Sequence, residues 1–397
     1  MNAISSRRLR GLVCAVATAA TALTAVAVTP AAEASTAKRP ASTTTAPDPS
    51  TANPTNPLAN RPWGFYSGQT DELFNAYRSA SGTNQSMIHE IAIEPRARTF
   101  GSWYANDWIQ QSVQNYIANV TQGNPNVLVQ MAIFRLQPWE NSACKTLPTA
   151  DQQASYKQWV DNFAAGVGNA HAAIVLQPDL PFAFCVPNQS LIPLQLTDYA
   201  ARVLSALPNT SVYIDAGAAD WSAVDRAVYL LRNAGIQYAR GFELNSTHFD
   251  GIGNQIFHGA AIVHSLAQAG FPGKHFVINT SGNGRPFTHP WYMQHGGTGP
   301  GYNSAPECVL PTDSHCVTLG VPPTWHVTDP RFKLHSNALT PAARYVDGYV
   351  WVGKPWMHDQ ANHFEMTRAI NEIKTWPFRA IAPSVRSKVQ VGYSTKR

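Results

Sequence analysis

The sequence is poor in charged side chains. Asp, Glu, Lys and Arg make up 13% of the 397 residues, against ~25% in an average soluble protein. The formal net charge is only +5, and no run of Lys or Arg follows the N-terminal segment. These two absences argue against a nucleic-acid-binding protein. The sequence also lacks H-x-H and H-E-x-x-H motifs, which disfavours a metal-dependent hydrolase, and we expect no metal site and no cofactor.

Residues 1–34 have the pattern of a secretory signal peptide. Arg7, Arg8 and Arg10 precede the apolar run GLVCAVATAATALTAVAV, and the sequence AEA at Ala32–Ala34 is typical of a cleavage site. A membrane anchor is the alternative. The small-residue cleavage site and the polar tract behind it favour removal, so we expect a secreted protein with no membrane contact after processing.

Cysteine is scarce, with five in the chain. Cys14 lies in the predicted signal peptide, which leaves Cys144, Cys185, Cys308 and Cys316. An even number of cysteines in an exported chain indicates disulfide bonds. Three pairings exist, and we favour Cys144–Cys185 with Cys308–Cys316 because each closes a loop of plausible length.

The remainder of the chain divides into a linker and one domain. Residues 35–56 are rich in Thr, Ala, Pro and Ser and lack apolar periodicity, which predicts a disordered linker. Residues 57–397 show no repeat and no second domain. Eleven Trp and fourteen Tyr are many; aromatic faces suit sugar rings, although most aromatic side chains of a domain form its core.

Short apolar runs alternate with helical patterns from about Asn60 onward. The runs lie near Met87, Val127, Ile174, Val212, Phe242, Val277 and Val350. Amphipathic helices are predicted between most of them, for example over Ser155–Ala170 and Asp220–Gly235. We therefore expect an α/β fold, a distorted parallel (β/α) barrel of about seven strands in a single domain. A doubly wound open sheet is the alternative, weakened because no G-x-G-x-x-G follows the first run.

Polar residues follow the predicted strands at their carboxyl ends, which is where the active site of a (β/α) barrel lies. They are Asp179, Asp215, Asn245, Asn279, Lys354 and Asp359. A single Asp at such a place is more often a cap or turn residue. Three acids at one rim favour a functional site.

Eight segments in order resemble glycoside hydrolase family 6, the inverting cellulases, over about residues 56–364. They are NPLANRPWGFY, PRARTFGSW, VLQPDL, VYIDAGAADW, FELNSTHF, FVINTSGNG, LGVPPT and VWVGKPWMHDQ. The resemblance implies hydrolysis of β-1,4-glucosidic bonds in cellulose or a related β-glucan, with inversion. It implies Asp179 as the general acid and Asp359 as the base or water-orienting carboxylate, with Asp215 supporting the oxocarbenium-like charge and the pKa of the acid. Together with the predicted signal peptide, we expect a secreted monomer whose ligand is a β-glucan polysaccharide or oligosaccharide.

The same resemblance suggests side chains for sugar binding. They are Trp63, Trp103, Trp221, Asn245, His248, Trp351 and Lys354, with Trp356 as a further aromatic candidate. Barrel packing is the alternative for each tryptophan. In the family, loops over the cleft decide between endo and exo action, and the long segment from His289 to Trp325, closed by Cys308–Cys316, is the candidate for such a loop.

The chain also departs from the family's pattern. The family carries an Asp before its first disulfide cysteine, where this sequence has Ala143. Two alternatives follow: Glu140 substitutes for that Asp from a longer loop, or Arg135 reshapes the site. Other family positions are changed as well, at Gln177, Ala218, Asn279, Gly282, Gly353 and Met357. These differences motivate a second hypothesis, a degenerate, non-catalytic polysaccharide-binding or cell-wall-associated protein on the same fold.

Overall fold

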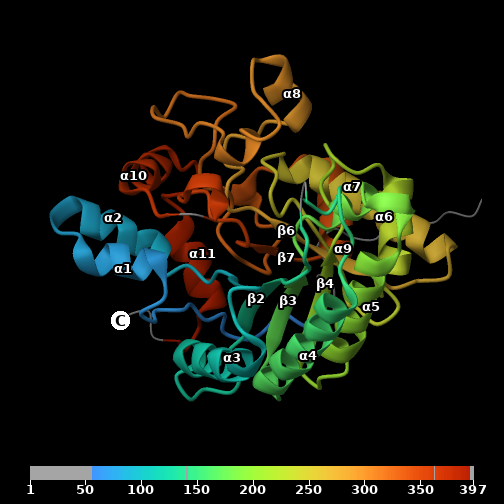
Figure 1. Ribbon diagram of the computed structural model, residues 1–397. Coiled ribbons are helices and arrows are strands. Elements are labelled where there is room, and N and C mark those ends of the chain that lie inside the picture. Colours follow the sequence, from blue (N-terminus) through green and yellow to red (C-terminus); the bar gives the residue numbers. More distant parts are fainter. Residues whose placement is uncertain (1–55, 140–141, 362, 394–397) are drawn as a thin grey trace, which may run out of the picture. The chain divides into compact units, whose positions relative to one another are not determined.

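A computed structural model describes residues 56–139, 142–361 and 363–393 (Figure 1). The predicted signal peptide 1–34 with Cys14, and residues 35–55 of the predicted linker, lie outside this part of the chain. None of the helices in the described ranges has the length and apolar character needed to cross a membrane.

The centre of the structure is a sheet of seven parallel strands in chain order. The strands are β1 (Arg98–Gly101), β2 (Val129–Phe134), β3 (Ala172–Leu176), β4 (Thr210–Asp215), β5 (Gly241–Leu244), β6 (His275–Asn279) and β7 (Val346–Val350). Each strand pairs with the next one along the chain, as in a barrel and unlike a doubly wound sheet. The backbone N–H of Ala97 donates to the carbonyl of Trp351 at 2.8 Å and brings the two ends of the sheet together. The expected distorted parallel barrel of seven strands is confirmed.

Helices surround the sheet (Figure 1). They are α1 (Glu72–Ser79), α2 (Gly82–Ala92), α3 (Asn106–Thr121), α4 (Ala150–Val167), α5 (Ile192–Ser205), α6 (Val224–Asn233), α7 (Ile252–Gln268), α8 (His289–Gln294), α9 (Ser336–Tyr345), α10 (Met366–Thr375) and α11 (Ala382–Val389). Helices α3 to α7 and α9 pack on the outer face of the strands in one large apolar cluster. A second cluster joins α1, α2 and α10.

The strands are apolar because both of their faces are covered. All five residues of β3 are buried. Ile174 and Leu176 belong to the cluster beneath the helices, whereas Ala173 and Val175 belong to the cluster inside the barrel. Alternate residues of a strand point to opposite faces, so a strand covered on both faces reads as a continuous apolar run.

Local signals in the sequence set the helix ends. Helix α4 begins at a capping box, in which the Thr149 side chain accepts the backbone N–H of Gln152 and the Gln152 side chain accepts that of Thr149. Helix α6 is followed by Gly235, whose φ of 94° stops the helix as its sequence predicts. Both predicted helices exist, with ends that differ by up to five residues from the expected ones.

The prediction of a first strand near Met87 is wrong. The segment forms α2, and its buried residues are Met87, Ile88, Ile91 and Ala92. Spacings of one, three and four residues place these side chains on one face of a helix. The first strand is instead β1, which contains Thr99 and Phe100 from the segment PRARTFGSW.

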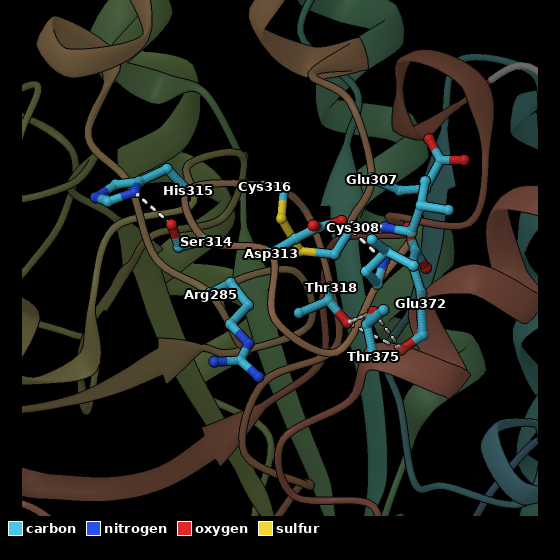
Figure 2. The surroundings of a disulfide bond; sticks show 12 residues. Arg285, Glu307, Cys308, Asp313, Ser314, His315, Cys316, Thr318, Glu372 and Thr375 are labelled. Atoms are coloured by element: carbon cyan, nitrogen blue, oxygen red, sulfur yellow. Dashed lines mark hydrogen bonds between the residues drawn. A yellow bond between two sulfur atoms is a disulfide. The ribbon is translucent and has the colours of Figure 1, made fainter.

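The structure contains two disulfide bonds, Cys144–Cys185 and Cys308–Cys316, in the favoured pairing. Figure 2 shows the second bond and its surroundings. There the Thr318 hydroxyl donates to the backbone carbonyl of Glu372 on α10 at 2.9 Å. The cross-linked loop is thereby attached to α10.

Asp347 organises the amino ends of four strands. It is fully buried near the start of β7. Both of its oxygens accept from the Arg240 guanidinium, at 2.8 and 2.9 Å, and the Tyr213 hydroxyl donates to it at 2.8 Å. His275 Nδ1 lies 3.5 Å away. Polar groups at this end of a barrel serve stability, since the site lies at the other end.

Asp347→Asn should lower the free energy of unfolding by roughly 3 kcal/mol, because it leaves the largely buried Arg240 charge uncompensated. Urea denaturation at pH 7 measures the change. Glu90→Gln is the matched control, because it breaks a bidentate pair with Arg379 that is more than a third exposed on both sides. The control should cost about 1 kcal/mol or less. Equal losses in the two variants would contradict a structural role for the buried pair.

Candidate active site

The carboxyl ends of the strands carry a group of polar side chains. Asp215 is the last residue of β4, and Asp179 follows β3 by three positions. Parallel strands bring these ends to one rim, where the active sites of (β/α) barrels lie. The structure brings the two acids into contact: Asp215 Oδ2 accepts the backbone N–H of Asp179 at 2.8 Å.

Asp215 joins two sharp turns. Its second oxygen, Oδ1, accepts the backbone N–H of Gly217 at 2.5 Å. Gly217 has a φ of 87°, and a Cβ at this position would lie 2.8 Å from Ser222 Oγ. Asp179 has a φ of 65°, which is uncommon for a residue with a side chain, and its bond to Asp215 stabilises that conformation. The small residues after Asp215 therefore permit the turn that lets one carboxylate hold two loops.

The Asp179 side chain is also held in place. It is 7% exposed, and the Thr247 hydroxyl donates to its Oδ1 at 2.7 Å. Thr247 comes from the loop after β5, so the ends of β4 and β5 hold the backbone and the carboxyl group of Asp179, respectively.

Three buried carboxyl groups lie together here. Burial and the neighbouring Asp179 carboxylate raise the pKa of Asp215 well above its usual range. Glu243 on β5 is the register partner of Asp215, and burial followed by the Asp215 charge raises the pKa of Glu243 in the same way. Glu243 is not among the site residues predicted from the sequence. The sequence does hold one indication of its position. Glu243 stands two residues before Asn245, and because alternate strand residues share a face, both are expected on the same side of the sheet.

Two cavities meet at Asp179. One has a volume of about 470 Å³ and the other about 460 Å³. Asp179, Thr247 and Asn303 line both. An extended chain that occupied both cavities would therefore pass the Asp179 carboxyl group.

The first cavity contains an aromatic and imidazole cluster. Trp221 stacks on the His248 ring with centroids 5.0 Å apart and planes inclined by 10°. Asp220 orients that ring through a 2.8 Å contact to Nδ1, and its other oxygen accepts the backbone N–H of His289 at 2.7 Å. Trp221 and His248, both predicted for sugar binding, line this cavity.

The second cavity contains the third predicted acid. Asp359 lies in a short 3₁₀ turn (His358–Gln360) with a φ of 50°. The Ser304 hydroxyl donates to the Asp359 carboxylate. The backbone N–H of Asp359 in turn donates to Ser304 Oγ at 3.1 Å. Trp103, which is 61% exposed, and Lys354 line this cavity.

Lys354 has an acidic partner in the same cavity. Its ammonium lies 3.3 Å from Glu72 Oε1. Burial would raise the pKa of Glu72, but Lys354 and then Arg96 outweigh it and lower that pKa to about 2. Glu72 is thus a fixed negative charge at the end of the second cavity.

The structure corrects four of the predicted sugar contacts. Trp63, Trp351 and Trp356 are fully buried in the core, and Asn245 is 1% exposed. Trp63 packs inside the barrel, and its indole N–H donates to the carbonyl of Leu58. The other two tryptophans pack beneath α1, α2 and α10. These three tryptophans therefore pack in the interior instead of facing a ligand: Trp63 inside the barrel, and the other two beneath the helices.

Asn245 and Asn279 connect strand ends. The Asn245 side-chain amide donates to the carbonyls of Asp250 and Asn279, each at 3.2 Å. The Asn279 amide donates to the carbonyl of Asn245 at 2.9 Å, and its oxygen accepts the backbone N–H of Val352 at 3.0 Å. These amides stabilise the rim between β5, β6 and β7.

The region that differs most from the family's pattern lies beside the first disulfide bond. Ala143 is buried, and Cys144 and Cys185 line the first cavity. Glu140 lies outside the described residues. The Arg135 guanidinium donates to Ser155 Oγ on α4 at 3.0 Å, so it is directed toward a helix on the outer face of the sheet. The hypothesis that Arg135 reshapes the site gains no support from this contact.

The long segment His289–Trp325 contributes to both cavities. Tyr302 lines the first cavity and Asn303 lines both. Ser304, the next residue, holds Asp359. The long loop that the sequence singles out therefore contacts Asp359.

Within the described ranges, no three His, Cys, Asp or Glu side chains are grouped so that they could hold a metal ion.

Comparison with known proteins agrees with this architecture. A family model described as "Glycosyl hydrolases family 6" matches residues 63–307. Endoglucanase A of Cellulomonas fimi is 31% identical over 229 residues, which is 57% of this chain and 48% of that protein. Endoglucanase 1 of Streptomyces halstedii is 28% identical over 255 residues, or 62% of this chain and 76% of that protein. The match thus spans about half the length of the first relative.

A solved structure shares the fold. The endoglucanase Cel6 from Mycobacterium tuberculosis, in complex with methyl-cellobiosyl-4-deoxy-4-thio-β-D-cellobioside, superposes with a TM-score of 0.63. The identity is 24%, and the superposition covers 80% of this chain and 98% of that chain. Since the family model also matches more than half of the 397 residues, the chain belongs to glycosyl hydrolases family 6.

Proposed function

We propose that this protein is a secreted glycoside hydrolase that cleaves β-1,4-glucosidic bonds of cellulose or a related β-glucan with inversion. The observation that carries the proposal is the position of Asp179 where two cavities meet, with the Asp359 carboxylate lining one of them. The names of the two curated relatives, both endoglucanases, support the substrate class. Residues 57–397 would form the catalytic domain, behind a signal peptide (1–34) and a linker (35–56).

Asp179 is proposed as the general acid. An inverting hydrolase needs one protonated carboxyl group at the leaving oxygen and one carboxylate, ~6.5–9.5 Å from it, that activates a water molecule on the opposite face of the sugar. Asp179 would give its proton to the glycosidic oxygen as the C1–O bond breaks. Its low exposure and its bond from Thr247 favour one fixed direction of proton transfer.

Asp359 is proposed as the base or as the carboxylate that orients the water. The water would form the new bond to C1, and its proton would pass to the carboxylate. Ser304 holds Asp359 through two hydrogen bonds and thereby limits its orientation. Asp215 would support the acid by fixing its backbone and by placing a second carboxyl group beside it.

Aromatic faces on both sides of Asp179 support an extended glycan as the ligand. Trp103 lies in one cavity, and the stacked pair of Trp221 and His248 lies in the other. Sugar rings stack on such faces through their C–H groups, while their hydroxyls reach polar neighbours. Export of the protein agrees with its two disulfide bonds.

A non-catalytic polysaccharide-binding or cell-wall-associated protein is the second candidate. It is favoured by the absence of carboxylates at Ala143 and Met357, where the family's pattern has acidic residues. It would use the same two cavities without hydrolysis.

Asp179→Asn should reduce reducing-sugar release from carboxymethyl cellulose and mixed-linkage β-glucan by about 10²–10⁴-fold, because it removes the proton donor. The same variant should retain much more of its activity on a dinitrophenyl cello-oligosaccharide, whose leaving group needs no proton. Asp359→Asn should lose activity on both kinds of substrate alike. Asp161→Asn on the outer helix α4 is the control and should leave all rates unchanged.

Two outcomes would count against this assignment. Full activity of Asp179→Asn on unactivated glucan would remove Asp179 from the mechanism. A folded wild-type protein that binds these glucans but releases no sugar between about pH 4 and 9 would favour the second candidate.

Trp103→Ala should raise KM for long β-glucans roughly 3- to 10-fold with little change in kcat, because a stacked ring contributes ~0.5–1.5 kcal/mol beyond its buried area. Initial rates over a range of glucan concentrations measure the effect. Trp108→Ala is the matched control, since Trp108 is 71% exposed on α3 but lines neither cavity among the described residues. An equal rise in KM for both variants would show that Trp103 offers no specific platform.

A further inference from the structure

Asp220 and His248 form a carboxylate–imidazole pair in the wall of the first cavity. Asp220 follows β4 by five positions, and His248 lies in the loop after β5. Asp220 Oδ1 is 2.8 Å from His248 Nδ1, and the two side chains are only 3% and 10% exposed. Each polar group thus replaces the water that the other would otherwise bind. The function proposed above uses His248 only as a ring face beside Trp221.

The second oxygen of Asp220 holds the start of the long loop. Asp220 Oδ2 accepts the backbone N–H of His289, the first residue of α8, at 2.7 Å. Burial raises the pKa of Asp220, but the contact with His248 and the hydrogen bond from His289 outweigh burial and lower that pKa below its usual value. Asp220 is therefore a carboxylate at neutral pH, and a carboxylate only accepts hydrogen bonds.

Asp220 consequently decides which nitrogen of His248 carries the proton. Since the carboxylate only accepts, His248 Nδ1 must be the N–H, and in the neutral ring Nε2 then has the lone pair. In the described part of the chain, Nε2 makes no hydrogen bond and is not one of the buried atoms without a partner. It is thus open to the cavity that His248 lines, and it presents an acceptor there.

Packing keeps the His248 ring in this orientation. Trp221 stacks on the ring, and Tyr302 meets it at an angle of 63° with centroids 5.1 Å apart. A half-turn of the imidazole would place a C–H group against the Asp220 carboxylate and lose the hydrogen bond. The residue before His248 is Thr247, which donates to Asp179. One short loop therefore carries both this acceptor and the side chain that holds the proposed acid.

The first cavity would receive the leaving-group side of the glucan. Asp359 lines the second cavity, and the base of an inverting hydrolase acts at C1 of the sugar that water attacks. That sugar would therefore occupy the second cavity. Asp179, at the junction, would protonate the oxygen that leads into the first cavity. A hydroxyl group of the departing sugar is the donor that would meet His248 Nε2.

We propose that Asp220 is a positioning residue that fixes His248 in the tautomer whose Nε2 accepts a hydroxyl group of the leaving-group sugar. The proposal rests on the function proposed above and deepens it, since it assigns the group that recognises this sugar. A buried carboxylate sets the tautomer of a catalytic histidine in the same way in serine proteases. Here the imidazole would bind the ligand and transfer no proton.

Asp220→Asn separates the tautomer from the packing. The His289 backbone N–H only donates, so the oxygen of the new amide must stay opposite it. The NH₂ group of the amide then faces His248 Nδ1 and requires a lone pair there, which moves the ring proton to Nε2. The Tyr302 hydroxyl also interacts with Asp220, but it either donates or accepts and does not oppose this arrangement. The variant thus keeps the loop attached and turns Nε2 into a donor.

Nitrogen-15 NMR of histidine-labelled protein shows the tautomer without any need for activity. We expect the His248 proton on Nδ1 in wild type and on Nε2 in Asp220→Asn. His264 on the outer helix α7 is the internal control, and its ring signals should be the same in both proteins. A proton on Nε2 of His248 in the wild-type protein at neutral pH, or on Nδ1 in both proteins, would overturn the proposal.

Fluorinated ligands test the acceptor itself. A sugar hydroxyl donates or accepts, whereas fluorine in its place only accepts. We would use cellotetraose with fluorine at C2, C3 or C6 of the third sugar from the non-reducing end, which leaves when the central bond is cleaved. One of the three analogues should have a roughly 10-fold lower kcat/KM than cellotetraose in wild type. Asp220→Asn should abolish most of this difference, because its Nε2–H can donate to fluorine.

Asp220→Ala and Asp161→Asn complete the comparison. If Asp220 served only to fasten the loop at His289, Asp220→Asn would treat every ligand as wild type does, and only Asp220→Ala would lose affinity; that result would refute the proposal. Asp161→Asn on α4 should show the wild-type preference for hydroxyl over fluorine. If wild type binds but does not hydrolyse cellotetraose, the proposed function fails. Calorimetric binding of the same ligands, together with the ring NMR, then still decides the role of Asp220.

Discussion

The bond from the Asp179 backbone N–H to the Asp215 carboxyl group is the contact on which the site depends. It joins the ends of β3 and β4 and stabilises Asp179 in a left-handed conformation. The glycine two residues after Asp215 completes the arrangement, because only a residue without a Cβ fits the turn. The sequence VYIDAG thus contains the end of a strand, a carboxylate that accepts two backbone N–H groups, and a turn whose conformation allows both bonds.

The barrel separates stability from chemistry along its axis. At the amino ends of the strands, the buried Asp347 is matched by the Arg240 guanidinium. At the carboxyl ends, Asp215 and Glu243 lie next to each other, and among the described residues no Lys, Arg or His side chain forms an ion pair with either of them. At the amino ends the charges are paired. At the carboxyl ends burial raises the pKa of the carboxyl groups, which lowers the stability of the folded protein. Such a cost is typical of sites where proton transfer is required.

The sequence predicts the architecture well because the barrel strands are covered on both faces. The apolar runs that form β2 to β7 can be recognised in the sequence alone. The run Met87–Ile93 predicts a strand but belongs to a helix, because a short apolar run fits both the two-residue repeat of a strand and the 3.6-residue repeat of a helix. Burial of individual side chains is harder to predict. Trp63 and Trp351 resemble sugar platforms in the sequence, yet tertiary packing buries them and leaves Trp103 exposed. Glu243 was missed because a lone acid in a short strand gives no local sign of its neighbours.

We propose that Asp179 and Asp359 act on opposite faces of one sugar ring. The most direct measurement is proton NMR of cellopentaose hydrolysis by the wild-type protein, recorded before the products mutarotate. We expect the newly formed reducing ends to be released first as the α-anomer, because water attacks from the face opposite the departing β-linked oxygen. Initial release of the β-anomer would contradict it, since retention requires a carboxylate to attack the sugar in place of water.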